Sequence, residues 1–356
     1  MSALTGWTEL DDRAIAYARA LAADAVQKVG NGHPGTAMSL APVAYTLFQR
    51  HLVHDPSDPQ WLGRDRFILS CGHSSLTLYI QLFLSGYGLE MKDLESFRTW
   101  GSLTPGHPEY GHTAGVEMTT GPLGQGVATA VGMAMAARYE RGLLDPNAPA
   151  NTSLFDHSIW VICSDGDLQE GVSAEAHSLA GTQELGNLNI IYDDNRISIE
   201  GDTHNAFTED VSARYRAYGW HVIEVAAAKD GNVDLVALDA AMTAAKNETA
   251  KPTLIRMKSV IAWPAPKAQG TAASHGSALG EDEIKATKVA LGLNPDENFA
   301  MPAEVLAHAR LVKERGAQAR KAWDLQFESW KSANAEKAAL LERLRTKSLP
   351  AGWDSD

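Results

Sequence analysis

The chain of 356 residues is long enough for one large domain with appendages or for two domains. Its 44% apolar and 21% charged residues are typical of an ordinary soluble globular protein. A net charge of −13 argues against nucleic-acid or anionic membrane partners, although a bound cation could create a local positive site.

The start of the chain has no features of export or membrane insertion. Residues 1–10 lack a basic segment followed by an apolar core, and no apolar run approaches the ~18 residues of a membrane span. Cys71 and Cys163 are the only cysteines, and each ends an apolar run, so we expect two buried free thiols. Free thiols fit a reducing compartment, and we predict a cytoplasmic location.

Hydrophobic periodicity divides the first part of the chain into helices and a strand. In chain order we predict helices over 11–29 and 39–51, a strand over 65–70, and helices over 76–85, 91–100 and 127–138. Residues 101–121 form a long irregular segment, which is usually either functional or disordered. Its histidines, aromatic residues and glycines argue against disorder, so a functional loop is expected.

Strands and helices alternate in the second part of the chain. In chain order we predict a strand over 157–163, a helix over 172–185, strands over 188–192 and 221–225, a helix over 233–246 and a strand over 252–260. This alternation predicts an α/β fold with a doubly wound, mostly parallel sheet and helices on both faces.

The C-terminal part of the chain has a different pattern. Residues 261–280 form a breaker-rich loop, and a charged helical pattern follows to about residue 344. Trp323, Phe327 and Trp330 recur at helical spacing and predict an apolar packing stripe. We therefore expect a sheet domain over 1–280, a helical extension over 281–347 and the start of a linker over 348–356.

Two oxygen-bearing side chains follow neighbouring predicted strands. Asp165 follows the strand that ends at Cys163, and Asn195 follows the strand that ends at Tyr192. Open α/β sheets bind ligands at this edge. Oxygen ligands suit Mg²⁺ or Ca²⁺, and a turn at Gly166 with the following helix start offers backbone N–H groups to phosphate. A metal together with a phosphate predicts a diphosphate ligand.

Histidines and glycines occur in the loops expected at the same edge. His73 lies at a strand-to-helix turn, where a functional role is favoured over a local cap. His33 lies in a Gly-Pro loop, and by itself it is more typical of an incidental solvent-facing histidine. The glycines over 121–126 permit close approach of a ligand or of another helix.

Together, these motifs resemble the N-terminal half of a transketolase, from about Thr8 to the C-terminus. They occur in the family's order: Gly32-His33-Pro34-Gly35, Cys71-Gly72-His73, Pro105-Gly106-His107-Pro108-Glu109, Gly121-Pro122-Leu123-Gly124-Gln125-Gly126, Asp165-Gly166-Asp167 and Asp194-Asn195. The last two resemble the thiamine diphosphate signature. Ser164 stands where that signature commonly has Gly, and Ala114 replaces a usual Pro.

The resemblance implies thiamine diphosphate with a bridging metal ion, Mg²⁺ or Ca²⁺. The implied metal ligands are the side chains of Asp165 and Asn195 and the carbonyl of Ile197. The implied cofactor-binding residues are His73, Gly121, Leu123, Asp165, Gly166, Glu170, Asn195, Ile199 and His275. Within this set, His73 and the Gly166 N–H would contact phosphates, Glu170 would buttress the site, and Leu123 and Ile199 would pack on the thiazolium ring.

The resemblance also implies a substrate channel lined by four histidines, namely His33, His73, His107 and His275. Imidazoles can donate, accept and shuttle protons near neutral pH, which carbon–carbon cleavage of a ketose requires. The family transfers a two-carbon ketol unit from a ketose phosphate to an aldose phosphate, a reaction of the pentose phosphate pathway. Sugar phosphates are therefore the expected substrates.

The family also has pyrimidine-binding and C-terminal domains, which we do not expect within these residues. We expect a diphosphate-binding half, either a fragment or one subunit of a split enzyme, that is inactive until a pyrimidine-binding half completes it. The expected partner is a second copy in a homodimer or a complementary C-terminal half. One alternative is a non-catalytic module that binds the cofactor or a partner. Another is a dihydroxyacetone synthase-like enzyme. A deoxyxylulose-phosphate synthase is disfavoured by the sequence around His107 and His112, and a dinucleotide oxidoreductase by the spacing of glycines over 121–126.

Overall fold

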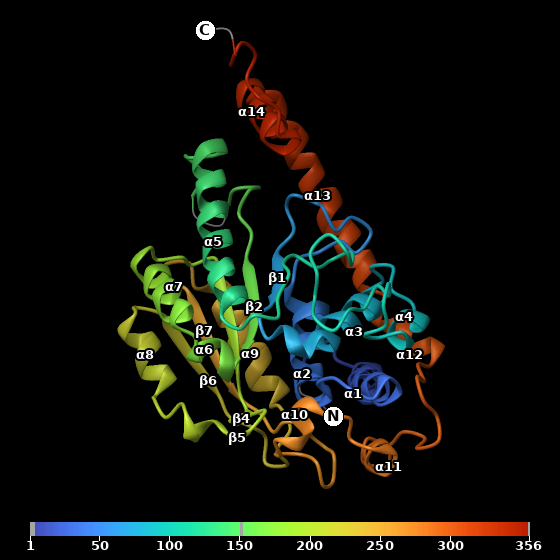
Figure 1. Ribbon diagram of the computed structural model, residues 1–356. Coiled ribbons are helices and arrows are strands. Elements are labelled where there is room, and N and C mark those ends of the chain that lie inside the picture. Colours follow the sequence, from blue (N-terminus) through green and yellow to red (C-terminus); the bar gives the residue numbers. More distant parts are fainter. Residues whose placement is uncertain (1–3, 150–151, 355–356) are drawn as a thin grey trace.

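A five-stranded parallel sheet lies at the centre of the molecule (Figure 1). The structure is a computed structural model that describes residues 4–149 and 152–354. The strands lie side by side in the order β1 (Arg66–Leu69), β2 (Ile159–Ser164), β3 (Leu188–Asp194), β7 (Thr253–Lys258) and β6 (His221–Val225). Every neighbouring pair in this sheet is parallel. The predicted α/β fold is thereby confirmed.

Helices cover both faces of the sheet, as predicted. Side chains of β2 alternate between two apolar cores, with Trp160 in one and Val161 in the other. The first core contains residues of α1 (Glu9–Val29), α2 (Pro34–Thr46), α3 (Ser75–Ser85) and α9 (Leu235–Asn247). The second contains residues of α5 (Gln125–Leu144), α7 (Gly171–Thr182) and α8 (Val211–Ala217). Burial on both faces explains why the central strands read as continuous apolar runs.

Shorter elements occupy the connections between these helices and strands. They are the π-helix η1 (Leu47–His51), the 3₁₀ helices η2 (Gly72–Ser74) and η3 (Thr203–Asn205), the helices α4 (Met91–Glu95), α6 (Asp165–Gln169) and α10 (Ala273–Gly276), and the hairpin strands β4 (Ile197–Ser198) and β5 (Gly201–Asp202). None of the helices in the described ranges is long and apolar enough to cross a membrane.

Two segments predicted as loop or turn are helical. Pro34 and Gly35 form the first turn of α2 rather than part of the preceding loop, because proline is well suited to the first helical position. Gly166 lies in α6 rather than in a turn. A capping box between Ser164 and Asp167 stabilises that helix start.

The C-terminal helices pack along one side of the sheet domain and extend beyond it (Figure 1). They are α11 (Glu281–Ala290), α12 (Ala303–Ala309), α13 (Val312–Ala333) and α14 (Ala335–Thr346). The buried ion pair between Lys288 and Asp24, 2.7 Å long, joins α11 to α1. The predicted stripe on α13 is confirmed, because Phe327 stacks on Trp323 and Trp330 packs edge-on against Phe155.

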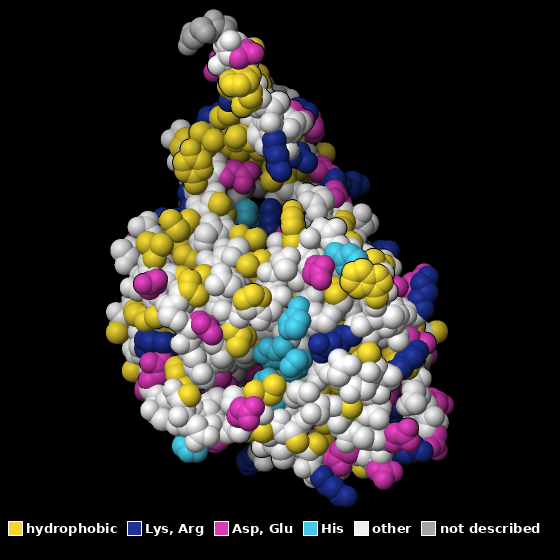
Figure 2. Space-filling model, in the orientation of Figure 1, with side chains coloured by type: hydrophobic (Ala, Val, Ile, Leu, Met, Phe, Trp, Pro, Cys, Tyr) yellow, Lys and Arg dark blue, Asp and Glu magenta, His cyan; other side chains and the backbone are white. Residues whose placement is uncertain are grey.

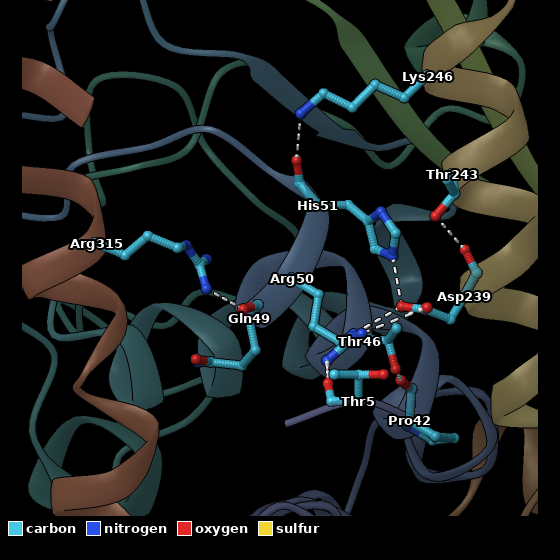
Figure 3. A network of polar contacts seen from close by, with 10 residues as sticks. All are labelled: Thr5, Pro42, Thr46, Gln49, Arg50, His51, Asp239, Thr243, Lys246 and Arg315. Carbon is cyan, nitrogen blue, oxygen red and sulfur yellow. Dashed lines mark hydrogen bonds and ion pairs between the residues drawn. The ribbon is translucent and has the colours of Figure 1, made fainter. Parts of the chain in front are cut away.

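A polar network joins η1 to α9 and α13 (Figure 3). The carboxylate of Asp239 accepts hydrogen bonds from Nε of Arg50, at 2.7 Å, and from Nε2 of His51, at 2.8 Å. Lys246 donates to the carbonyl of His51, and Arg315 donates to the carbonyl of Gln49. The network includes none of the predicted site residues, and its contacts link η1 to the two helices.

Candidate active site

The predicted site residues lie mainly in loops that follow the carboxyl ends of the strands (Figure 1). His73 follows β1, Asp165 follows β2, Asn195 and Ile197 follow β3, His275 follows β7, His33 occupies the N-cap position of α2, and His107 and Gly121 lie in the long loop before α5. Parallel pairing places these strand ends at one edge, which is the edge where open α/β sheets bind ligands.

Three of the four predicted histidines form a compact cluster. The imidazole of His73 stacks on that of His275, with ring centroids 4.9 Å apart. The ring of His33 lies 5.1 Å from His73 and 5.5 Å from His275. Figure 2 shows histidine side chains gathered near the centre of one face of the molecule. Residues from three distant parts of the chain therefore share one site.

Burial disfavours the charged form of the imidazoles in this cluster. Burial, with help from the neighbouring imidazoles, lowers the pKa of His33 to about 4 and the pKa of His73 well below its usual value. Burial also lowers the pKa of His275. Nδ1 of His33, Nε2 of His73 and Nδ1 of His275 are buried with no partner within the protein. Such atoms are available to a polar ligand.

The glycine-rich loop before α5 presses against the fourth histidine and the segment that carries His73. A Cβ atom on Gly121 would lie 3.2 Å from Cδ2 of His107, and one on Gly72 would lie 2.7 Å from the backbone N of Gly121. Gly121 also has a φ of 147°, which other residues rarely adopt. The loop can approach both histidines because these positions lack side chains.

The carboxylate of Asp167 holds the parts of the site together. It is fully buried and accepts hydrogen bonds from Oγ of Ser70 at 2.7 Å and from the N–H groups of Gly124 at 2.9 Å and Ser164 at 3.0 Å. Asp167 therefore joins the end of β1, the glycine-rich loop and the start of α6. Sequence analysis gave this residue no role, although the capping-box spacing from Ser164 to Asp167 is a signal that could have found it.

Asp165 presents one oxygen atom without a partner. The side chain is 3% exposed, and its Oδ1 accepts a hydrogen bond from the hydroxyl of Tyr192 at 2.5 Å. Oδ2 is buried and unpaired. Burial, together with the nearby Asp193 and Asp194, raises the pKa of Asp165 to about 7. A cation at Oδ2 would reverse this cost, so the donor suits a metal ion.

The loop after β3 lies beside Asp165. The backbone N–H of Arg196 opposes the rise in the pKa of Asp165. Asn195 is held by its own loop, because its Oδ1 accepts from the N–H of Ile197 at 2.8 Å and its Nδ2 donates to Asp193 at 2.9 Å. In the described parts of the chain, no group of three or more His, Cys, Asp or Glu side chains could hold a metal. The predicted ligands are instead one carboxylate, one amide oxygen and one backbone carbonyl.

The remaining predicted cofactor residues lie around this edge. A Cβ atom on Gly166 would lie 2.8 Å from Cδ1 of Leu123, and one on Gly276 would lie 3.3 Å from Cδ1 of Ile199. The side chain of Ile199 is 60% exposed, which leaves an apolar surface beside the histidine cluster. The side chain of Glu170 is also exposed. Their individual roles stay predictions.

The family of the chain follows from its match to known proteins. Residues 10–350 match the family described as transketolase, thiamine diphosphate binding domain. The chain belongs to the transketolase family. The transketolases of Mycobacterium leprae and Mycobacterium tuberculosis are each 59% identical to it over 350 residues, which is 98% of this chain. These residues make up 50% and 49% of the two relatives, so the chain spans about half the length of the curated transketolases it matches.

Solved transketolase structures have the same fold. A Pichia stipitis transketolase in complex with sedoheptulose-7-phosphate superposes with a TM-score of 0.91 at 44% identity, covering 98% of this chain and 50% of that one. The transketolase of Leishmania mexicana also superposes with a TM-score of 0.91, at 40% identity, over 97% of this chain and 51% of its own. The predicted resemblance to the N-terminal half of a transketolase is thus confirmed.

Proposed function

We propose that this chain is the diphosphate-binding half of a thiamine diphosphate-dependent transferase that moves a two-carbon ketol unit from a ketose phosphate to an aldose phosphate. The observation that carries the proposal is the unpaired, buried Oδ2 of Asp165 at the same sheet edge as the cluster of His33, His73 and His275, in a chain of the transketolase family. This arrangement suits a metal-bound diphosphate next to a sugar-binding channel.

Asp165, Asn195 and Ile197 would hold Mg²⁺ or Ca²⁺, and the Gly166 N–H and His73 would receive the diphosphate. Support comes from the orphaned carboxylate oxygen and from the contact between Gly166 and Leu123, which leaves no room for a Cβ atom. Thiamine diphosphate, when bound, supplies the carbanion stabilisation that carbon–carbon cleavage needs. The domain would then comprise residues 1–280, followed by the extension over 281–347 and a linker start over 348–356.

The histidines would bind sugar hydroxyls and move their protons. A neutral imidazole can accept a proton from a hydroxyl group, whereas an imidazolium cannot. The low pKa values of His33 and His73 keep these rings neutral at pH 7, and their unpaired nitrogens give them free positions for a hydroxyl group. His107, whose pKa is also lowered by burial and by Arg98, would act from the opposite loop.

The complete activity is expected to require more than this chain, because the chain spans about half of each matched relative. Residues for the remaining part would come from a complementary C-terminal half, and a homodimer is the proposed assembly. Sugar phosphates are the proposed substrates, as in the Pichia stipitis complexes with xylulose-5-phosphate and fructose-6-phosphate. A cytoplasmic location and a place in the pentose phosphate pathway stay predictions.

Ketol transfer by the chain with and without a complementary half tests the proposal. We expect no transfer by the chain alone and measurable transfer, dependent on thiamine diphosphate and Mg²⁺, when the two halves are mixed. The same half-length coverage favours one other candidate, a module that binds cofactor without turnover. Cofactor binding without activity in the mixture would favour that module.

A further inference from the structure

The loop that contains His275 packs on the first turn of α2. It comprises residues 259–276, and the short helix α10 at its end lies beside α2 (Figure 1). The two segments approach each other closely at Gly35, two residues after His33. A Cβ atom on Gly35 would lie 2.5 Å from the backbone carbonyl oxygen of Ser274, the residue before His275. The lack of a side chain at Gly35 therefore allows the two segments that carry these histidines to meet.

The helix itself does not require a glycine at this position. Gly35 is the second residue of α2, where alanine is the better helix former because glycine loses more conformational freedom. The carbonyl oxygen of Gly35 also accepts a hydrogen bond from the N–H of Ala262 at 3.0 Å. Gly35 thus contacts the loop at two points, Ala262 near its start and Ser274 near its end. Close approach of the loop explains why this position is a glycine.

A buried arginine of α1 holds the same loop. Arg19 is 4% exposed, and Cζ of its guanidinium group lies 4.4 Å from the centre of the Trp263 ring. Its Nε donates to the carbonyl of Met38 at 3.1 Å, and its Nη2 donates to Oδ1 of Asn232 at 2.6 Å. Burial lowers the pKa of Arg19 to about 9, so the charge is kept in the interior at a cost. Arg19 therefore joins Trp263, which follows Ala262 directly, to α1 and α2.

The contacts at the two ends of the loop determine where the His275 ring lies. Within the loop, the N–H of Gly270 donates to the carbonyl of Ile261 at 2.9 Å, which links its first half to its second. A displacement at Gly35 would therefore carry His275 with it. The ring of His275 lies 4.9 Å and 5.5 Å from the other two imidazoles of the cluster, and its buried Nδ1 has no partner within the protein.

We propose that Gly35 and Arg19 position His275 for its role in the site, by holding the loop after β7 on the first turn of α2. The inference rests on the proposed function, because it concerns a histidine assigned there to the sugar hydroxyls. Neither Gly35 nor Arg19 is proposed to touch the sugar or the cofactor. Their effect is on geometry, and a displacement of about 1 Å in a group that acts on substrate can lower a rate by about a hundredfold.

NMR of this chain with labelled histidines provides the first test. A Cβ atom on Gly35 must displace a backbone carbonyl, so Gly35→Ala should abolish the NOE between the stacked rings of His73 and His275 and shift the His275 signals. The signals of His54, a buried ring outside the site, should stay unchanged and so report an intact fold. Gly132→Ala, on α5, is the matched control, because nothing lies within 4 Å of its Cβ position. Unchanged His275 signals in a folded Gly35→Ala protein would overturn the inference.

The arginine provides a second, independent variant. Arg19→Met keeps an unbranched side chain but removes the guanidinium group, and it should shift the His275 signals in the same way. Arg19→Lys keeps the charge without the planar group and should give an intermediate shift. Arg13→Met, at a more exposed position of α1, is the control. If Gly35→Ala does not fold, this series decides, and His275 signals that are equal in Arg19→Met and wild type would overturn the inference.

Ketol transfer by the chain together with its complementary half shows whether the displacement matters for the reaction. Gly35→Ala should lower kcat/KM by about tenfold to a hundredfold, whereas Gly132→Ala should change it by less than about twofold. Transfer at the wild-type rate despite shifted His275 signals would overturn the positioning role. Wild-type halves that transfer no ketol would refute the proposed function, and the NMR comparison would then decide by itself whether Gly35 and Arg19 hold His275 in place.

Discussion

The hydroxyl of Tyr192 donates a hydrogen bond to Oδ1 of Asp165, while Oδ2 of the same carboxylate is buried with no partner. One residue of β3 thus orients the first side chain after β2 and leaves the second carboxylate oxygen without a partner. A carboxylate arranged in this way is ready to bind a cation without first breaking its own contacts.

Replacing the carboxylate of Asp165 should weaken cofactor binding while the chain still folds. We expect Asp165→Asn to weaken Mg²⁺-dependent binding of thiamine diphosphate by more than about a hundredfold, because the amide removes the charge that a metal requires. Calorimetric titration of the purified chain would measure this. Asp296→Asn, at an exposed position, is the matched control. Unchanged binding in Asp165→Asn would exclude Asp165 as a metal ligand.

Removing the tyrosine hydroxyl should have a smaller effect of the same kind. In Tyr192→Phe the carboxylate keeps its charge but loses the group that orients it, so binding of thiamine diphosphate with Mg²⁺ should weaken by about tenfold to a hundredfold. The same titration measures the effect. A loss as large as that of Asp165→Asn would contradict a purely orienting role, and full affinity would show that the hydrogen bond is dispensable.

Alanine substitutions at two helical glycines should change the free energy of unfolding in opposite directions. A Cβ atom on Gly181, in α7, would lie 1.8 Å from the backbone carbonyl oxygen of Tyr218, which cannot rotate away. Gly181→Ala should therefore lower the free energy of unfolding by about 3 kcal/mol. Gly132, in α5, has nothing within 4 Å of that position, so Gly132→Ala should raise it by about 0.5–1 kcal/mol. Urea denaturation checks both values.

Stability should fall on acidification below neutral pH. His54 is buried, its Nε2 lies 3.0 Å from the carbonyl of Phe48 and its Nδ1 lies 2.8 Å from the hydroxyl of Tyr87, and burial lowers its pKa to about 4. The unfolded chain, with a histidine pKa near 6.5, therefore binds more protons between these two values. Stability is fully present above pH 6.5 and is lost toward pH 4, by about 2 kcal/mol between pH 7 and pH 5 for this residue.

Urea unfolding at pH 7 and pH 5 measures that loss. His54→Gln should reduce the difference between the two pH values, although it also lowers stability at pH 7 because a buried hydrogen-bonded ring is replaced. His204→Gln, at an exposed position, should leave the difference unchanged. A wild-type protein that is equally stable at both pH values would contradict the prediction.

Local sequence patterns were sufficient to predict the fold class and the family of this protein. Alternating apolar runs and helical segments predict a parallel sheet, because each strand buried on both faces needs apolar residues throughout its length. Asp165 and Asn195 each follow one of these strands. Because the carboxyl ends of parallel strands meet at one edge of the sheet, both side chains could be predicted to lie there. The order of short motifs, from the loop of His33 to Asp194-Asn195, then led to the transketolase family, which the matched relatives confirm.

Other features depended on the packed fold. His33, judged alone, reads as an incidental loop residue, yet it lies against His73 and His275 because the strand order brings their three loops together. Such contacts join segments far apart in the chain, and local periodicity carries no information about them. The same reason explains why Tyr192 was missed. It acts through Asp165, a neighbour in space whose position is set by packing between strands and loops.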